Sequence, residues 1–125
     1  SDEYQEMEQL ITQELPRLQQ RRVKYQEELV EAREELSHYK RALRSDEIYR
    51  DNMDVYGHPD DWEVRKIKKS ITQNEESIDQ SLEKLDSIIE KITKIDEQIR
   101  DIVNMLNTDY KNAYKEFKEF HNLDA

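Results

Sequence analysis

The fold is decided by residues 64–106, VRKIKKSITQNEESIDQSLEKLDSIIEKITKIDEQIRDIVNML. Apolar side chains recur there at steps of three or four residues, and this spacing continues to Phe120. Such steps keep one narrow stripe of a helix facing a partner helix, as in the seam of a coiled coil. The predicted seam of this half consists of Val64, Ile67, Ile71, Asn74, Ile78, Leu82, Leu85, Ile89, Ile92, Ile95, Ile99, Ile102, Leu106, Tyr110, Ala113, Phe117 and Phe120.

This predicted seam has two irregular features. Equal steps adjoin at Ile78, Ile92 and Leu106, which predicts local stutters in the supercoil. Asn74 is its one polar position. A single polar seam residue typically fixes the register of the helices at some cost in stability, and we expect that role for Asn74.

The first half of the chain carries a second seam. Its members are Leu18, Arg22, Tyr25, Leu29, Ala32, Leu36, Tyr39 and Leu43, again at steps of three and four. Before them, the stripe continues through Tyr4, Met7, Ile11 and Leu15. Because Pro16 removes a backbone donor and its ring clashes with the preceding turn, we expect a kink there or a fresh helix start near Leu15.

The two halves are joined by DNMDVYGHPDDWE, residues 51–63, which holds the one glycine of the chain. Gly57 and Pro59 suit a reversal of the chain. Asp60 is the predicted N-cap of the second helix, accepting the amide of Glu63 while the Glu63 side chain reaches back. We therefore predict helices at about 2–50, with a kink near Pro16, and at about 61–121, joined by a turn at 51–60.

The predicted fold class is all-α, a long antiparallel coiled-coil helical hairpin over residues 1–125. In such a hairpin, facing residues have numbers that sum to about 111. An isolated pair of helices buries little apolar surface, so we expect assembly into a helical bundle or a hetero-coiled coil. A fragment of a larger coiled-coil protein is an alternative interpretation.

Composition excludes several classes of function. The chain is 40% charged and 34% hydrophobic, with a net charge of −10, which opposes binding to nucleic acid. It has no cysteine, and no apolar run reaches the length of a membrane span or a signal peptide. We expect a soluble, intracellular protein of the cytoplasm.

The connection is also similar in spacing to the calcium loop of an EF-hand. Counted from Asn52, that spacing places Asp54, Gly57, Asp60 and Glu63 at positions 3, 6, 9 and 12. The pattern departs from the motif at its first, fifth and eighth positions, which are Asn52, Tyr56 and Pro59. We expect no resident metal, and weak candidate ligands are Asn52, Asp54, Asp60 and Glu63.

No arrangement of residues predicts an enzyme. His38, His58 and His121 are scattered, and the paired carboxylates lie on solvated helix faces with no pocket to raise a pKa. We expect neither catalysis nor a cofactor.

The C-terminal residues carry the predicted partner-binding surface. Beyond residue 109 the first helix has ended, yet apolar residues continue at helical spacing and need another surface to cover them. These candidates are Leu106, Tyr110, Tyr114, Phe117 and Phe120. A second candidate surface is the hairpin tip, with Tyr56, Gly57, Pro59 and Trp62.

Three functions remain open. The first is a coiled-coil structural or assembly subunit that binds protein, either another copy or another coiled-coil subunit. The second is a small helical regulator or chaperone that masks a partner with its aromatic C-terminal stripe. The third is a calcium-responsive helix–loop–helix. Heptads alone cannot distinguish these functions.

Overall fold

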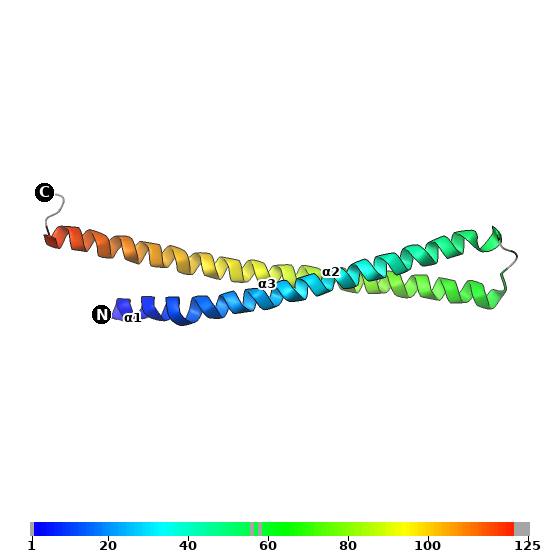
Figure 1. Ribbon diagram of the computed structural model, residues 1–125, viewed down its shortest axis with the longest axis horizontal. Helices are drawn as coiled ribbons and strands as arrows, with labels where there is room; N and C mark the ends of the chain where they lie inside the picture. The colour runs from blue at the N-terminus through cyan, green and yellow to red at the C-terminus, as the bar shows by residue number, and fades with distance from the viewer. Residues whose placement is uncertain (1, 56, 58, 122–125) are drawn as a thin grey trace. The chain divides into compact units, whose positions relative to one another are not determined.

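The computed structural model of the protein describes residues 2–55, 57 and 59–121, except for the side chains of residues 3, 54 and 121. The described residues contain no strand. The elements are α1 (Asp2–Gln9), the π-helical turn η1 (Leu10–Glu14), α2 (Leu15–Asn52), the 3-10 turn η2 (Met53–Val55) and α3 (Asp61–His121). The fold is therefore all-α, and two helices pack against each other (Figure 1).

Asp60 sets the start of α3. Its Oδ1 accepts the backbone N–H of Glu63 at 2.8 Å, and its carbonyl accepts that of Val64 at 3.1 Å. The predicted N-cap is thus confirmed. The carboxylate of Glu63 does not reach back to the cap, because it accepts the hydroxyl of Tyr49 on α2.

The chain divides into two compact units, each made from both long helices. Unit 1 comprises Ser1–Tyr25 and Lys91–Ala125, and unit 2 comprises Gln26–Glu90. In unit 1, side-chain contacts between α2 and α3 join Arg22 to Asp96 and Tyr25 to Lys91. In unit 2, the corresponding contacts are Glu35–Lys84, Asp46–Ser70, Asp46–Asn74 and Tyr49–Glu63.

These contacts correct the predicted register. Facing residues were predicted to have numbers that sum to about 111, but every contact except Tyr49–Glu63 joins numbers that sum to between 116 and 120. The reason is the length of the first helical segment, because helical backbone continues through η2 to Val55. The connection is therefore centred a few residues later than predicted.

The seam of α3 is more regular than predicted. Buried and half-buried residues repeat every seven residues at two positions, which we call a and d, without a stutter from Val64 to Asp109. Position a holds Val64, Ile71, Ile78, Leu85, Ile92, Ile99 and Leu106, and position d holds Ile67, Asn74, Ser81, Ile88, Ile95, Ile102 and Asp109.

Six predicted seam residues are exposed and were therefore wrong: Leu82, Ile89, Tyr110, Ala113, Phe117 and Phe120. Leu82 and Ile89 are 43% and 47% exposed, whereas Ser81 and Ile88, one residue earlier, are buried. Keeping the strict period of seven places Ser81 and Ile88 at d and rotates the larger aliphatic neighbours out of the seam. The predicted stutters at Ile78 and Ile92 disappear with this correction, and the one at Leu106 disappears because Asp109, not Tyr110, holds the next position d.

In α2 the predicted seam agrees with burial. All eight residues from Leu18 to Leu43 that were assigned to it are buried or half-buried. Leu18 and Ala32 are the most completely buried of them.

The helix ahead of Pro16 contains a wide turn. In η1 the N–H of Leu15 donates to the carbonyl of Leu10, five residues back, instead of the usual four. A regular helix would press the ring of Pro16 against the carbonyl of Thr12, and the wider turn lies where that clash would occur. The extra residue also changes the helix phase: Leu10 is half-buried, whereas the predicted seam residues Ile11 and Tyr4 are exposed.

Candidate protein-interaction surface

A line of apolar side chains lies beside the seam of α3. It occupies the residue after position d, called position e, and its apolar members are Leu82, Ile89, Val103, Tyr110 and Phe117. Each of these five side chains is between 41% and 69% exposed. One residue turns a helix by about 100°, so a helix that covers a and d leaves e at the edge of the contact. We call this line the outer stripe.

The outer stripe occurs in both units. Unit 2 contains Leu82 and Ile89, and unit 1 contains Val103, Tyr110 and Phe117. At the C-terminal end of α3, Tyr114 and Phe120 add two more exposed aromatic side chains. Of the predicted partner-binding residues, only Leu106 is placed differently, because it is half-buried at position a.

The first helix extends farther along α3 than the sequence predicted. Tyr4 and Met7 line a hollow of about 500 Å³ together with residues of α3 as far as Glu119. The segment after residue 109 is therefore not a bare overhang. The α3 residues in this hollow are Asp109, Asn112, Ala113, Lys115, Glu116 and Glu119, and the four exposed aromatic side chains are not among them.

Charges are sorted around the C-terminal end of α3. Three acidic residues, Asp109, Glu116 and Glu119, lie in the hollow beside α1, together with one basic residue, Lys115. Lys111 and Lys118, which are seven residues apart at position f, occupy the heptad position farthest from the seam. The ammonium of Lys118 is 5.0 Å from the ring centroid of Tyr114, a cation–π contact at the border of the aromatic side chains.

In unit 1 an ion pair joins α2 to α3, and its acidic member lies on the line of the outer stripe. Arg22 donates from Nε to Oδ1 of Asp96 at 2.6 Å and from Nη2 to Oδ2 at 3.4 Å. Asp96 holds position e, so the pair replaces an apolar member of the stripe with a bidentate cross-helix contact. The hydrogen bond from Arg22 lowers the pKa of Asp96, and desolvation opposes this effect. The same contact raises the pKa of Arg22.

Unit 2 contains a polar layer in its seam. Oδ2 of Asp46 accepts the hydroxyl of Ser70 at 2.5 Å and the Nδ2 amide of Asn74 at 2.9 Å. All three residues are half-buried. Among the described residues, no buried side-chain nitrogen or oxygen lacks a hydrogen-bond partner. The predicted polar position Asn74 thus has a specific partner on α2, which ties one point of α2 to one point of α3.

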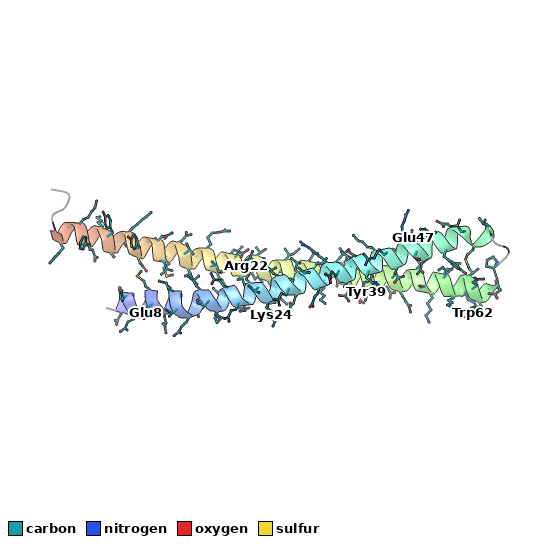
Figure 2. All side chains as sticks on the ribbon, in the orientation of Figure 1. Glu8, Arg22, Lys24, Tyr39, Glu47 and Trp62 are labelled. Atoms are coloured by element: carbon teal, nitrogen blue, oxygen red, sulfur yellow. The ribbon has the colours of Figure 1, made fainter. Side chains whose placement is uncertain are left out.

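The predicted tip site is only partly described, because Tyr56 lies outside the described residues. Trp62, near the start of α3, is exposed (Figure 2). The ammonium of Lys66 lies 5.0 Å from the centroid of its ring. Gly57 has φ of 132°, a conformation that side-chain-bearing residues rarely adopt. Gly57 and Pro59 line a hollow of about 550 Å³ with Ile48, Tyr49 and Met53, among others.

The candidate metal ligands have other partners. Asp60 caps α3, and Glu63 accepts the hydroxyl of Tyr49, whose pKa is raised by that hydrogen bond. Asn52 donates from Nδ2 to the carbonyl of Ile48 at 2.9 Å, and the side chain of Asp54 lies outside the described residues. Within the described part of the chain, no group of three or more carboxylate or histidine side chains is arranged to hold a metal ion.

The histidines do not form a site in the described structure. His38 is exposed, and its ring meets that of Tyr39 edge-on at 5.6 Å. His58 and the side chain of His121 lie outside the described residues.

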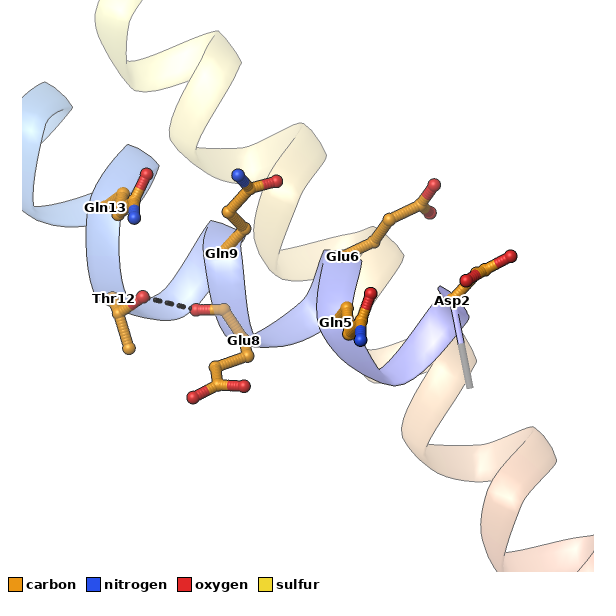
Figure 3. A pocket seen from close by; sticks show the side chains of 7 residues that line it. All are labelled: Asp2, Gln5, Glu6, Glu8, Gln9, Thr12 and Gln13. Carbon is orange, nitrogen blue, oxygen red and sulfur yellow. Dashed lines mark hydrogen bonds between the residues drawn. The ribbon is translucent and has the colours of Figure 1, made fainter.

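The outer face of α1 is polar. A hollow of about 460 Å³ is lined by Asp2, Gln5, Glu6, Glu8, Gln9, Thr12 and Gln13 (Figure 3). The Thr12 hydroxyl donates to the Glu8 carbonyl at 2.6 Å, beside the wide turn. Acidic and amide groups line this face without any basic residue, which suits solvent exposure or contact with a basic surface.

No helix in the described part of the chain combines the length and the apolar composition that spanning a bilayer requires.

Comparison of the chain with protein-family models, with curated proteins and with solved structures finds no match.

Proposed function

We propose that this chain is a coiled-coil assembly subunit without catalytic activity, built as an antiparallel hairpin, that binds protein helices within a larger complex. The observation that carries the proposal is the outer stripe of α3. Apolar side chains that repeat every seven residues beside an occupied seam are typical of a helix with a second helical neighbour. The proposal makes the stripe the binding surface and the hairpin its support.

The order of contacts supports the antiparallel hairpin. Residue numbers rise along α2 from Arg22 to Tyr49 while those of their α3 partners fall from Asp96 to Glu63. The same period of seven in the seam of α2 places Leu36 at position a and continues to Arg50. Glu35 and Lys84 therefore both occupy the residue before position a, called position g, and so do Tyr49 and Glu63. Reversing one helix brings the same flank of each helix together, so pairing of g with g is expected of an antiparallel pair.

Two introduced cysteines test the hairpin, because the natural chain has none. In the Glu35→Cys, Lys84→Cys variant, a short bis-maleimide is expected to join the two sites within one chain at every protein concentration. The control is Glu35→Cys, Lys68→Cys, whose second site lies about 24 Å farther along α3. Equal cross-linking of both variants, or cross-links only between chains, would overturn the hairpin.

A photo-reactive amino acid in place of Tyr114 tests the binding function in cells that express the protein. The control is the same amino acid in place of Asp86, which is exposed at the same heptad position in unit 2. We expect cross-links to a defined protein from position 114 and not from position 86. Recovery of the same proteins from both positions, or of none from position 114, would contradict the proposed role of the C-terminal end of α3.

A further inference from the structure

In unit 1, α3 carries apolar side chains that stay exposed beside the seam with the first helical segment of the same chain. Val103, Tyr110 and Phe117 lie at position e, and Tyr114 lies one step farther around the helix at position b. All four side chains are more than 40% exposed. A helix that contacts this face has to lie beside the seam, where a third and a fourth helix lie in a bundle.

The first helix of the same unit presents opposite chemistry. Because of the wide turn in η1, Ile11 points out of the seam and is 52% exposed. Residues 2–16 include five acidic residues and no basic one. The outer surface of α1 and η1 is therefore negatively charged, with Ile11 as an exposed apolar residue.

Charge complementarity indicates what covers the aromatic face of α3. Lys111 and Lys118 lie at position f, at the border of the face of α3 that carries the aromatic residues. Within one chain, however, α1 shares its hollow with three acidic residues of α3, Asp109, Glu116 and Glu119, and with one basic residue, Lys115, so like charges predominate there. The acidic α1 of one chain is matched by the lysine-bordered face of α3 in another chain.

We infer that the occupant of this face is a second copy of the chain. Two copies of unit 1 pack side by side, with the position-e residues of one α3 against those of the other. Tyr114 and the position-f lysines, farther around each α3, then meet the acidic α1 of the other copy. The same patch serves both copies, which gives a closed two-fold dimer with four helices at the interface.

This inference rests on the proposed function, since it names the partner of the same surface. The first experiment is light scattering behind size exclusion on the purified full chain, over a hundredfold range of concentration. A dimer is expected, dissociating only at the lowest concentrations. A monomer throughout would overturn the second copy as occupant, whereas cross-links from position 114 to a different protein would leave the proposed function standing.

Charge reversal then tests the pairing itself. The first variant carries Lys111→Glu and Lys118→Glu, and the second carries Glu6→Lys and Glu8→Lys. Each variant alone places like charges at the interface, and its dimer dissociation constant is expected to rise on the order of 100-fold. An equimolar mixture of the two is expected to form a heterodimer of nearly native affinity.

The mixture separates contacts between chains from contacts within one chain. If the lysines and acids meet only within a chain, mixing the variants cannot restore association. A control variant with Lys68→Glu and Lys69→Glu makes the same change of charge on exposed residues of unit 2 and is expected to remain dimeric. Failure of the mixture to associate, or equal weakening by the control, would overturn the inference.

A second variant removes the apolar part of the contact. Tyr110→Gln, Phe117→Gln changes two exposed side chains, so the helix content measured by circular dichroism is expected to persist while the dimer dissociates. A dimer that survives this change with unaltered affinity would contradict the proposed interface.

Discussion

Ile88 and Ile89 are neighbours with opposite environments, which makes them a matched test of the seam. Ile88 is 3% exposed at position d, and Ile89 lies in the outer stripe. Ile88→Ala should lower the free energy of unfolding by about 2–4 kcal/mol, because it leaves a cavity between the helices. Ile89→Ala should lower it by less than about 1 kcal/mol. Urea denaturation measures both, and equal losses would contradict the corrected seam.

The ion pair of Arg22 and Asp96 gives stability a dependence on pH. Its hydrogen bond lowers the pKa of Asp96 in the folded state, so its contribution is complete above the pKa of the unfolded carboxyl group. That contribution is lost as the pH falls through the folded pKa. The effect is small, because both side chains are more than a third exposed.

Asp96→Asn should therefore make the free energy of unfolding fall less steeply as the pH is lowered. At very low pH, where Asp96 is protonated, the substitution should change the free energy of unfolding little. The measurement is the free energy of unfolding between pH 2 and pH 7, with the exposed Asp101→Asn as the control for one lost charge. In the native sequence, Arg22→Gln should raise the pKa of Asp96 followed by NMR. An unchanged pKa would show that Arg22 does not set it.

Among single residues, hydrophobicity alone predicted most members of the α3 seam but misplaced six, two of them within the regular part of the seam. Steps of three or four allow either Ser81 or Leu82, and the more apolar residue is the natural choice. The unbroken period of seven at position a, from Val64 to Leu106, was the signal that decides for Ser81 and Ile88. The outer stripe was missed for the same reason, since four of its five apolar members, all except Val103, had been assigned to the seam.

Among the elements, the polar layer of unit 2 couples α2 to α3 at one register. Asn74→Leu removes one of the two donors to Asp46 and should cost about 1 kcal/mol, because the carboxylate stays half-buried. Asp46→Leu combined with Asn74→Leu should recover that loss, since an apolar pair fits the seam. A double-mutant cycle by urea denaturation measures the coupling, and additive effects would contradict a direct contact.

The elements differ in how far the sequence predicted them. The seam of α2 and the cap at Asp60 follow from local patterns, and the structure bears both out. The wide turn in η1 does not follow, because Pro16 predicts a disturbance without saying whether the helix kinks, restarts or gains a residue. The register was also mispredicted, since nothing in the pattern shows that helical backbone extends through Val55.

For the whole molecule, the net charge of −10 is a source of self-repulsion. Raising the salt concentration from about 10 mM to about 300 mM should therefore raise the melting temperature by a few degrees, because screening acts on exposed charges over about a Debye length. The comparison needs a fixed protein concentration, since dimerisation also affects melting. A fall in melting temperature would show that attractive ion pairs outweigh the repulsion.

The wide turn in η1 has a consequence for how this protein can change. In a regular helix of this sequence Tyr4 and Ile11 would occupy seam positions, but the wide turn takes up one extra residue, and Met7 and Leu10 are the half-buried residues instead. Loss of a single codon between residues 10 and 14 would remove that extra residue, so a regular helix would join the two parts with their present inner and outer faces. Evolution can therefore shorten the first helical segment by one residue without exchanging its faces.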